Sequence, residues 1–243
     1  DSSTSRGLGD VYKRQAENHM QKELKEQISN LHLRIKNASD NIPSKSNDIT
    51  VIAVSKKKTH DHIKYAYDIG IRNFGENYAQ ELEEKANHLR LENIIWHFIG
   101  PLQSNKAKSI SNNADWIHSL DREKIANKVN SECGNLNKKI NGCIQINISE
   151  EQSKSGLRPG ELLDYADHIK SLENIDLKGI MVLPSLTGDV GEQMIKSKKL
   201  HDKLIKSFPN AKYLSMGTTN DFESAIKFGS NMIRVGELIF GKR

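Results

Sequence analysis

Apolar positions along most of the chain follow two alternating patterns. Short runs that are apolar on both faces, such as ITVIAVS at 49–55, alternate with longer stretches in which apolar residues recur every three or four positions. The short runs are typical of buried parallel strands, and the longer stretches are typical of amphipathic helices. Strands are predicted at 49–55, 73–77, 94–99, 116–120, 143–148, 179–183, 212–216 and 232–235. Helices are predicted at 60–69, 78–89, 105–111, 122–133, 160–172, 192–207 and 221–228, with a last short segment at 238–240.

The order of these elements predicts an α/β fold, a single closed (β/α)8 or TIM barrel. Eight strand–helix repeats follow one another at roughly 25-residue spacing, close to the ~30 residues of a βαβ unit. Leu24, Ile28, Leu31 and Ile35 have helical spacing and predict an extra helix before the first strand. A doubly wound open sheet built from the same elements is the alternative fold.

The start of the chain does not fit this pattern. Residues 1–15, DSSTSRGLGDVYKRQ, are small, polar and without periodicity, and the chain does not begin with methionine. We therefore expect residues 1–19 to be a non-native remnant of cloning or sequencing, or else a disordered native arm. Residues 20–243 are expected to form the barrel domain, with Met20 as the native start.

The composition argues against several classes of function. The formal net charge is +5 with both signs interspersed, which does not indicate a nucleic-acid-binding surface. Cys133 and Cys143 have no metal-binding or redox spacing and favour a reduced, cytoplasmic setting. No apolar run approaches the ~18–20 residues of a membrane span. We expect a monomer, because no second domain or apolar seam is visible.

In such a barrel the functional site lies where strands end and helices begin. The first predicted strand ends at Ser55, and Lys56 follows it at once. Partial desolvation at this place disfavours the charged form of an amine and leaves it nucleophilic toward aldehydes. The alternative is a solvated lysine, which is how we interpret the neighbouring Lys57 and Lys58.

The ends of the last two strands offer groups for an anion. SMGTTND at 215–221 leads into a helix, and RVGE at 234–237 follows the eighth strand. Glycine lets the backbone approach a ligand, amides at a helix N-terminus favour phosphate, and barrels often bind phosphate in these two loops. Thr219 or Asn220 can also simply cap the helix that begins near Asp221. The candidate binding residues here are Ser215, Met216, Gly217, Thr218, Arg234, Gly236 and Glu237.

Other polar residues at strand ends are also candidates. Glu76 and Asn77 can orient a ligand ring. His97 and His118 are either catalytic bases or hydrogen-bonded histidines of the barrel. The remaining histidines show no metal-ligand spacing. A lysine nucleophile together with an anion site fits a phosphorylated aldehyde, either pyridoxal 5'-phosphate or a sugar phosphate handled by a cofactor-free Schiff-base aldolase.

Several segments resemble the YggS/PROSC family, the pyridoxal phosphate homeostasis proteins, from about Met20 to the C-terminus. The resemblance implies a fold-type III barrel like the N-terminal domain of alanine racemase, with pyridoxal 5'-phosphate held as a Schiff base on Lys56. The segments are AVSK at 53–56, FGENYAQE at 74–81, WHFIGPLQSNK at 96–106, QINISEEQSKSG at 145–156, LSMGTTNDFESAI at 214–226 and IRVGELIFG at 233–241.

The resemblance also implies roles for further residues. Asn77 would lie beside the cofactor ring, and Arg234 would contact the phosphate side or, as we prefer, the pyridine nitrogen. Lys154 and Gly156 match a family motif to which we assign no role. The phosphate would be surrounded by Ser215, Gly217 and Gly236.

The resemblance implies a carrier that buffers pyridoxal 5'-phosphate and delivers it to apo-enzymes, without robust turnover. An arginine against the ring nitrogen would keep that nitrogen unprotonated and weaken the electron sink. Alanine racemase completes its site with a second domain and a tyrosine of a partner subunit, whereas this chain ends at Arg243, directly after the barrel. A weak racemase or lyase using the same cofactor is the alternative.

Two positions depart from the family pattern. Lys57-Lys58-Thr59 stands where the family often has Thr-Lys-Pro, and Glu237 stands where a small serine or threonine is common. A carboxylate facing phosphate repels it. We therefore expect the Glu237 side chain to point away from the phosphate while its backbone amide binds.

Overall fold

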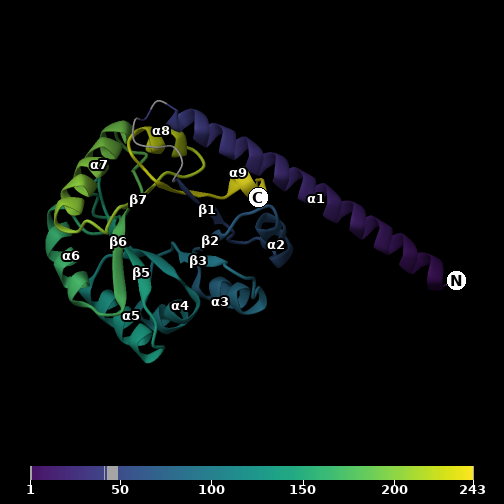
Figure 1. Ribbon diagram of the computed structural model, residues 1–243, viewed down its shortest axis with the longest axis horizontal. Helices are drawn as coiled ribbons and strands as arrows, with labels where there is room; N and C mark the ends of the chain where they lie inside the picture. The colour runs from purple at the N-terminus through teal and green to yellow at the C-terminus, as the bar shows by residue number, and fades with distance from the viewer. Residues whose placement is uncertain (1, 41, 43–48, 243) are drawn as a thin grey trace.

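Eight parallel strands close into a barrel in which β1 pairs with both β2 and β8 (Figure 1). The computed structural model describes residues 2–40, 42 and 49–242. Each strand pairs with the next along the chain, so the predicted (β/α)8 barrel is confirmed. The strands are β1 Thr50–Val54, β2 Asn73–Glu76, β3 Ile95–Phe98, β4 Trp116–Leu120, β5 Ile140–Ile146, β6 Ile175–Val182, β7 Tyr213–Met216 and β8 Met232–Val235.

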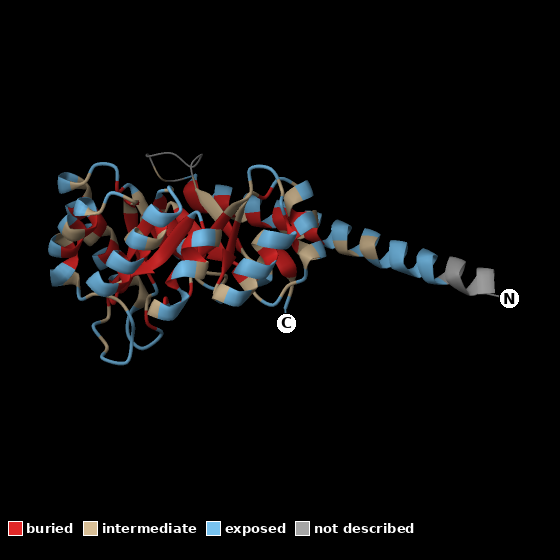
Figure 2. Cartoon of the chain, turned by 90° about the horizontal axis from the view of Figure 1, so that it is seen from below, coloured by how far each residue is buried: buried red, intermediate tan, exposed pale blue. Residues whose placement is uncertain are grey.

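Helices follow the strands and lie around the barrel, with their exposed faces outward over buried strands (Figure 2). In the described part of the chain, no helix is both long enough and apolar enough to cross a membrane. Two short 3-10 helices, η2 Ser104–Lys106 and η3 Pro159–Glu161, precede α4 and α6. The helices after β1 are α2 His60–Asp68, α3 Ala79–His88, α4 Ala107–Asn113, α5 Glu123–Asn135, α6 Leu162–Ser171, α7 Val190–Ser207, α8 Phe222–Lys227 and α9 Glu237–Phe240.

The extra helix before the barrel, α1, is one continuous element from Ser2 to Ser39. Its second half packs against α2, α8 and α9 through the buried residues predicted from their helical spacing, among them Leu24 and Leu31. Its first half extends beyond the barrel, and residues 9–16 are exposed (Figures 1 and 2). The helix thus includes most of the segment 1–19, whose native or non-native origin stays a prediction; residue 1 lies outside the described residues.

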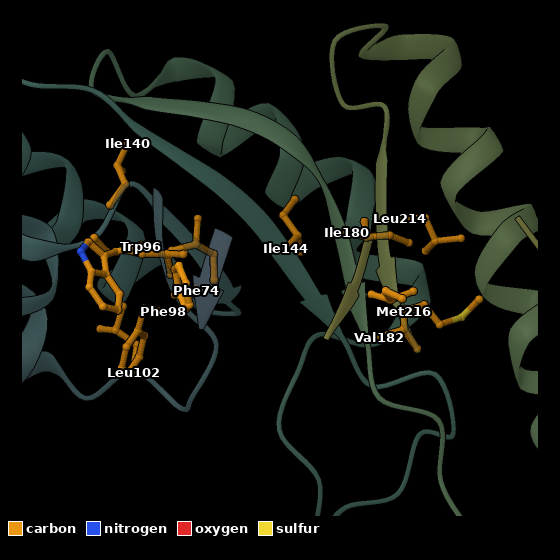
Figure 3. Packing of buried hydrophobic residues seen from close by; sticks show 14 of the residues in the cluster. Phe74, Trp96, Phe98, Leu102, Ile140, Ile144, Ile180, Val182, Leu214 and Met216 are labelled. Atoms are coloured by element: carbon orange, nitrogen blue, oxygen red, sulfur yellow. The ribbon is translucent and has the colours of Figure 1, made fainter. Parts of the chain in front are cut away.

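The described residues form two hydrophobic clusters. The larger one lies between the strands and the surrounding helices and contains residues such as Phe74, Phe98 and Met216 (Figure 3). The smaller one joins side chains of five strands spread around the closed ring, which places it inside the barrel. Its members are Ile52, Trp116, Cys143, Met181 and Met232.

Two strands begin earlier than the sequence predicted. β5 begins at Ile140 instead of 143, and β6 begins at Ile175 instead of 179. Asp176 and Lys178 are only partly buried there and alternate with buried residues. This part of the strand therefore looks polar in sequence, although its backbone pairs with β5 from Ile140 onward.

Candidate functional site

A cavity of about 290 Å³ lies at the edge of the barrel where the strands end. Because all eight strands are parallel, residues far apart in the sequence meet at this edge. The volume is at the lower end of the range of small-molecule sites. The lining residues are Val54, Lys56, Lys58, Asn77, Ile99, Leu183, Thr218, Thr219, Asn220, Arg234, Gly236, Glu237 and Gly241.

Most of the candidate binding residues predicted from the sequence meet at this cavity. The cavity wall also includes Thr219 and Asn220, which belong to the turn predicted to hold an anion but were not named individually as binding residues. Their place after β7 agrees with that prediction for the turn as a whole. The predicted residues that line the cavity are Lys56, Asn77, Thr218, Arg234, Gly236 and Glu237.

Ser215, Met216 and Gly217 are buried and do not line the cavity. The Met216 side chain belongs to the core outside the barrel. Gly217 has a φ of 105°, and a Cβ built there would lie 2.8 Å from the Cβ of Ala225 on α8. Close packing of α8 therefore already requires this glycine, without the ligand approach suggested by the sequence. A role of these three residues in ligand binding stays a prediction.

The loop that carries Lys56 is held at its far end by Lys58. Lys57 is exposed, as predicted, and has a φ of 61°, so the chain turns sharply after Lys56. Lys58 was predicted to be solvated, which is wrong. Its side chain is partly buried, and its Nζ donates to the carbonyl oxygen of Phe240 at 2.9 Å. The loop is therefore tied to the end of α9, whose first residue lines the same cavity.

A buried cluster of acidic and basic groups holds the other side of this loop. Lys85 of α3 donates to the carbonyl oxygen of Ser55 and to Glu76 Oε1, both at 2.7 Å, and to Glu81 Oε2 at 2.8 Å. The Ser55 hydroxyl donates to Glu76 Oε1 at 2.7 Å, and the Lys57 N–H donates to Glu81 Oε2 at 2.8 Å. Glu76, which the sequence analysis assigned to a ligand ring, is fully buried in this cluster instead.

The pKa values of the two carboxyl groups in the cluster are shifted in opposite directions. Burial raises the pKa of Glu76, and the Lys85 ammonium opposes this rise only in part. Burial also acts to raise the pKa of Glu81, but the hydrogen bonds from Lys85 and from the Lys57 N–H outweigh it and lower that pKa. Glu81 is therefore the anion that balances Lys85 most firmly.

The turn after β7 uses its amides in two ways. The Thr218 N–H donates to Asp221 Oδ1 at 2.7 Å, and the Thr218 hydroxyl donates to the same oxygen at 3.1 Å. Asp221, rather than Thr219 or Asn220, is the N-cap residue of α8. The backbone N–H groups of Thr219 and Asn220 find no acceptor within the described residues, so they remain available to an anion.

The turn after β8 offers a second pair of amides. Gly236 is the N-cap residue of α9, and the N–H groups of Glu237 and Leu238 have no acceptor in the described part of the chain. Amides of a first helical turn lack partners inside the helix and suit an anion. The Glu237 side chain is exposed and also borders a groove against Arg34 of α1.

Asn77 lines the cavity, and one polar atom of its side chain lacks a hydrogen-bond partner among the described residues. This atom is the side-chain oxygen Oδ1, which is buried. A buried polar atom without a partner costs about 1–3 kcal/mol, so a hydrogen-bond donor that reaches this atom would be stabilised there. A ligand that presents a hydrogen-bond donor next to Lys56 fits this atom.

A chain of hydrogen bonds crosses the interior of the barrel below the cavity. Arg234 Nη1 donates to Ser215 Oγ at 2.6 Å, and Ser215 Oγ lies 3.0 Å from His118 Nδ1. His118 Nε2 lies 2.9 Å from His97 Nδ1, and His97 Nε2 lies 2.8 Å from Asn73 Oδ1. The residues come from β8, β7, β4, β3 and β2, so the chain spans the barrel.

Donation along this chain has a single consistent direction. Asn73 Oδ1 can only accept, so a neutral His97 donates to it and accepts from His118 at Nδ1. His118 then accepts the proton of Ser215, which itself accepts from Arg234. Each histidine then carries its proton on Nε2, and His97 donates to Asn73. Burial lowers the pKa of His97 to about 3. Burial, followed by electrostatic repulsion from a protonated His97 and from the Arg234 cation, lowers the pKa of His118 well below 6.5. Both are neutral, hydrogen-bonded barrel histidines, one of the two interpretations left open by the sequence.

Arg234 is the end of this chain that reaches the cavity. Its Nη1 is held by Ser215 and its Nη2 donates to the carbonyl oxygen of Val182 at 3.2 Å, which fixes the plane of the guanidinium. Burial lowers its pKa to about 10, so it is still a cation at neutral pH. Arg234 therefore gives the cavity a positive group of fixed orientation that can donate but cannot accept.

The barrel and its strand-end site place the chain in a recognised class. The family described as alanine racemase, N-terminal domain, matches residues 29–243, so the fold and site define a barrel of this type. Among the relatives, the pyridoxal phosphate homeostasis protein of Pasteurella multocida is 40% identical over 227 residues, covering 90% of this chain and 97% of the relative. The protein of the same name from Haemophilus influenzae is 44% identical over 204 residues, covering 81% of this chain and 86% of the relative. The chain belongs to the family of pyridoxal phosphate homeostasis proteins.

A solved structure supports the same grouping. The structure of PipY from Synechococcus elongatus, with pyridoxal phosphate bound, has a TM-score of 0.77 and 29% identity to this chain. The match covers 90% of this chain and 100% of PipY. The family and the alanine-racemase-like barrel predicted from the sequence are thereby confirmed.

Proposed function

We propose that this chain binds pyridoxal 5'-phosphate reversibly, as a Schiff base on Lys56, and acts as a non-enzymatic carrier in the homeostasis of this cofactor. The observation that carries the proposal is the meeting of Lys56 with the turns after β7 and β8 around one cavity. The name shared by the relatives and the pyridoxal phosphate bound to PipY support it.

The groups around the cavity match the parts of this cofactor. Lys56 offers an amine that attacks the aldehyde carbon, so that a C=N bond replaces the C=O bond and water leaves. The amides of Thr219, Asn220 and Glu237 suit the phosphate. Asn77 Oδ1, which has no hydrogen-bond partner among the described residues, suits a hydroxyl donor on the ring. The bound cofactor supplies the aldehyde, and the chain supplies the amine, the anion site and the ring contacts.

Arg234 is compatible with a carrier, and alanine racemase tolerates such an arginine as well. A guanidinium that can only donate requires an acceptor opposite it, so a ring nitrogen placed there is unprotonated. An unprotonated ring is the weaker electron sink for carbanion chemistry. Among the described lining residues, the remaining ionisable side chains are Lys56, Lys58 and Glu237, and Lys58 is bonded to backbone carbonyls.

We further propose that residues 20–243 form the binding domain of a monomer that works in the cytoplasm and passes the cofactor to apo-enzymes. A C=N bond that water can reverse suits delivery. Cys133 and Cys143 are both unpaired and buried, which supports a reducing compartment.

The absorbance spectrum of the purified protein with pyridoxal 5'-phosphate tests the proposal. Wild type and the control Lys64→Ala, a lysine variant on the surface of α2, should show the visible Schiff-base band, and Lys56→Ala should lose it. Borohydride reduction followed by peptide mass analysis should locate the adduct on Lys56. An unchanged spectrum in Lys56→Ala would contradict the assignment.

The alternatives give different results in the same set of assays. Repeated turnover of an amino acid with exchange of its α-proton would favour a racemase or lyase. Protein that ignores pyridoxal 5'-phosphate but is trapped by a sugar phosphate and borohydride would favour an aldolase.

A further inference from the structure

The residue before the proposed cofactor lysine has all of its polar groups bonded. The Ser55 N–H donates to the carbonyl oxygen of Gly75 at 3.0 Å, and its hydroxyl donates to Glu76. Its carbonyl oxygen accepts from Lys85 Nζ at 2.7 Å and from the Lys58 N–H at 3.0 Å. Ser55 is also fully buried, so its peptide groups have one fixed orientation.

The residue after the lysine is fixed by the same cluster. Lys57 has the left-handed φ of 61°, which costs roughly 1–2 kcal/mol for a residue with a side chain. Its N–H donates to Glu81 Oε2, and Lys85 Nζ holds that same oxygen at 2.8 Å. One buried ammonium therefore connects the backbone on both sides of Lys56.

The cluster is poorly explained as a ligand site or as a source of stability. Glu76, Glu81 and Lys85 do not line the cavity, and Glu76 and Lys85 are only 0% and 4% exposed. The desolvation of buried ions offsets most of their attraction, so apolar residues of similar volume would stabilise a fold as well or better. A charged group that bonds to backbone atoms does what an apolar group cannot, because it fixes the orientation of peptide groups.

We propose that Lys85, Glu76 and Glu81 are positioning residues that hold the backbone around Lys56 so that its amine faces the cavity. The inference rests on the proposed function of Lys56. Glu76 and Glu81 of the FGENYAQE segment, together with Lys85, would then act on the site without contacting the ligand.

A positioning role has a specific signature. The cluster holds the end of β1, whereas the predicted anion site lies in the turns after β7 and β8. Loss of the cluster should therefore slow the covalent step and leave non-covalent binding nearly intact. A displacement of a reacting group by about 1 Å can slow a reaction up to ~100-fold, so we expect the rate of the covalent step to fall about tenfold.

The test compares Glu81→Ala with Glu84→Ala on the same helix. Glu81 accepts from the Lys57 N–H, whereas the exposed Glu84 lies 3.7 Å from His60 and has no other ionic partner among the described residues. The rate of Schiff-base formation with pyridoxal 5'-phosphate should fall about tenfold in Glu81→Ala and stay at the wild-type value in Glu84→Ala. The affinity for pyridoxine 5'-phosphate, an alcohol that cannot form a Schiff base, should change less than about threefold in both variants.

A second variant, Lys85→Met/Glu76→Gln, removes the ammonium together with the fully buried carboxylate of Glu76 and leaves the partly exposed Glu81 in place. Its covalent rate should fall in the same way while cooperative thermal unfolding shows that it still folds. Folded variants with wild-type rates would overturn the positioning role, as would an equal loss of covalent rate and analogue affinity. A wild-type protein that forms no adduct on Lys56 would instead overturn the proposed function itself.

Discussion

Lys85 Nζ lies 2.7 Å from the carbonyl oxygen of Ser55, thirty positions earlier in the chain. Through this contact α3 reaches the end of β1, and the same ammonium pairs with Glu76 at 2.7 Å. Both side chains of the ion pair are at least 95% buried. The pair therefore lies outside the reach of solvent screening, and loss of one partner should have a large effect.

Removal of the cation alone should destabilise the fold strongly. Lys85→Met leaves Glu76 buried without its partner, and we expect the free energy of unfolding to fall by about 3–5 kcal/mol. Lys85→Met/Glu76→Gln should recover most of this loss. Urea denaturation measures both, with Lys64→Met as a surface control that should cost at most about 1 kcal/mol. A double variant as unstable as the single one would show that the charge is not the cause.

Lys57 should tolerate glycine better than a helical lysine does. Because Lys57 has a φ of 61°, glycine relieves strain there and should leave stability unchanged or raise it by up to ~1 kcal/mol. The same substitution at Lys64, inside α2, should cost about 1 kcal/mol. Thermal or urea unfolding of the two variants gives the comparison, and equal losses would contradict the strain at Lys57.

Substitution by alanine should change the stability of the fold differently at two buried serines of the barrel. Ser215→Ala leaves Arg234 Nη1 and His118 Nδ1 without their partner and should cost about 1–3 kcal/mol. The hydroxyl of Ser119 is buried without a partner among the described residues, so Ser119→Ala should be neutral or stabilising. Denaturation midpoints of both variants measure the difference. Equal costs would mean that the hydrogen-bond chain adds nothing at Ser215.

The neutral histidines should make the fold sensitive to acid. A histidine whose pKa is lowered in the folded state binds a proton more readily when unfolded, so stability is present above the unfolded pKa of about 6.5 and falls as the pH drops. For His97 the loss continues down to a pH of about 3. Each such histidine contributes a slope of up to ~1.4 kcal/mol per pH unit.

His118→Gln isolates this effect, because the amide of glutamine can still donate to His97. The dependence of unfolding free energy on pH between about 6 and 4 should become shallower by about one proton in this variant. His168→Gln on α6 controls for the loss of a histidine elsewhere. Identical slopes in wild type and His118→Gln would show that the pKa of His118 is not lowered in the folded state.

The alternation of apolar runs determined the barrel, and the barrel determined where the site would be. Parallel strands end at one edge, so the position of Lys56 directly after the first run placed it beside the turns after the last two. Neither step needs tertiary information, because both follow from chain order. The helical spacing of Leu24 to Ile35 likewise predicted the face of α1 that is buried.

Only the tertiary structure decided what the polar side chains at that edge contact. Glu76 was expected at a ligand but bonds to Ser55 and Lys85, and Lys58 was expected in solvent but bonds to Phe240. The pair of Glu81 and Lys85 is visible as a four-residue helical spacing, yet its contact with Ser55 is not. His118 and Ser215 meet across ninety-seven positions. Such partners depend on strand register and on the direction of each side chain, which a closed barrel fixes only when all eight strands are in place.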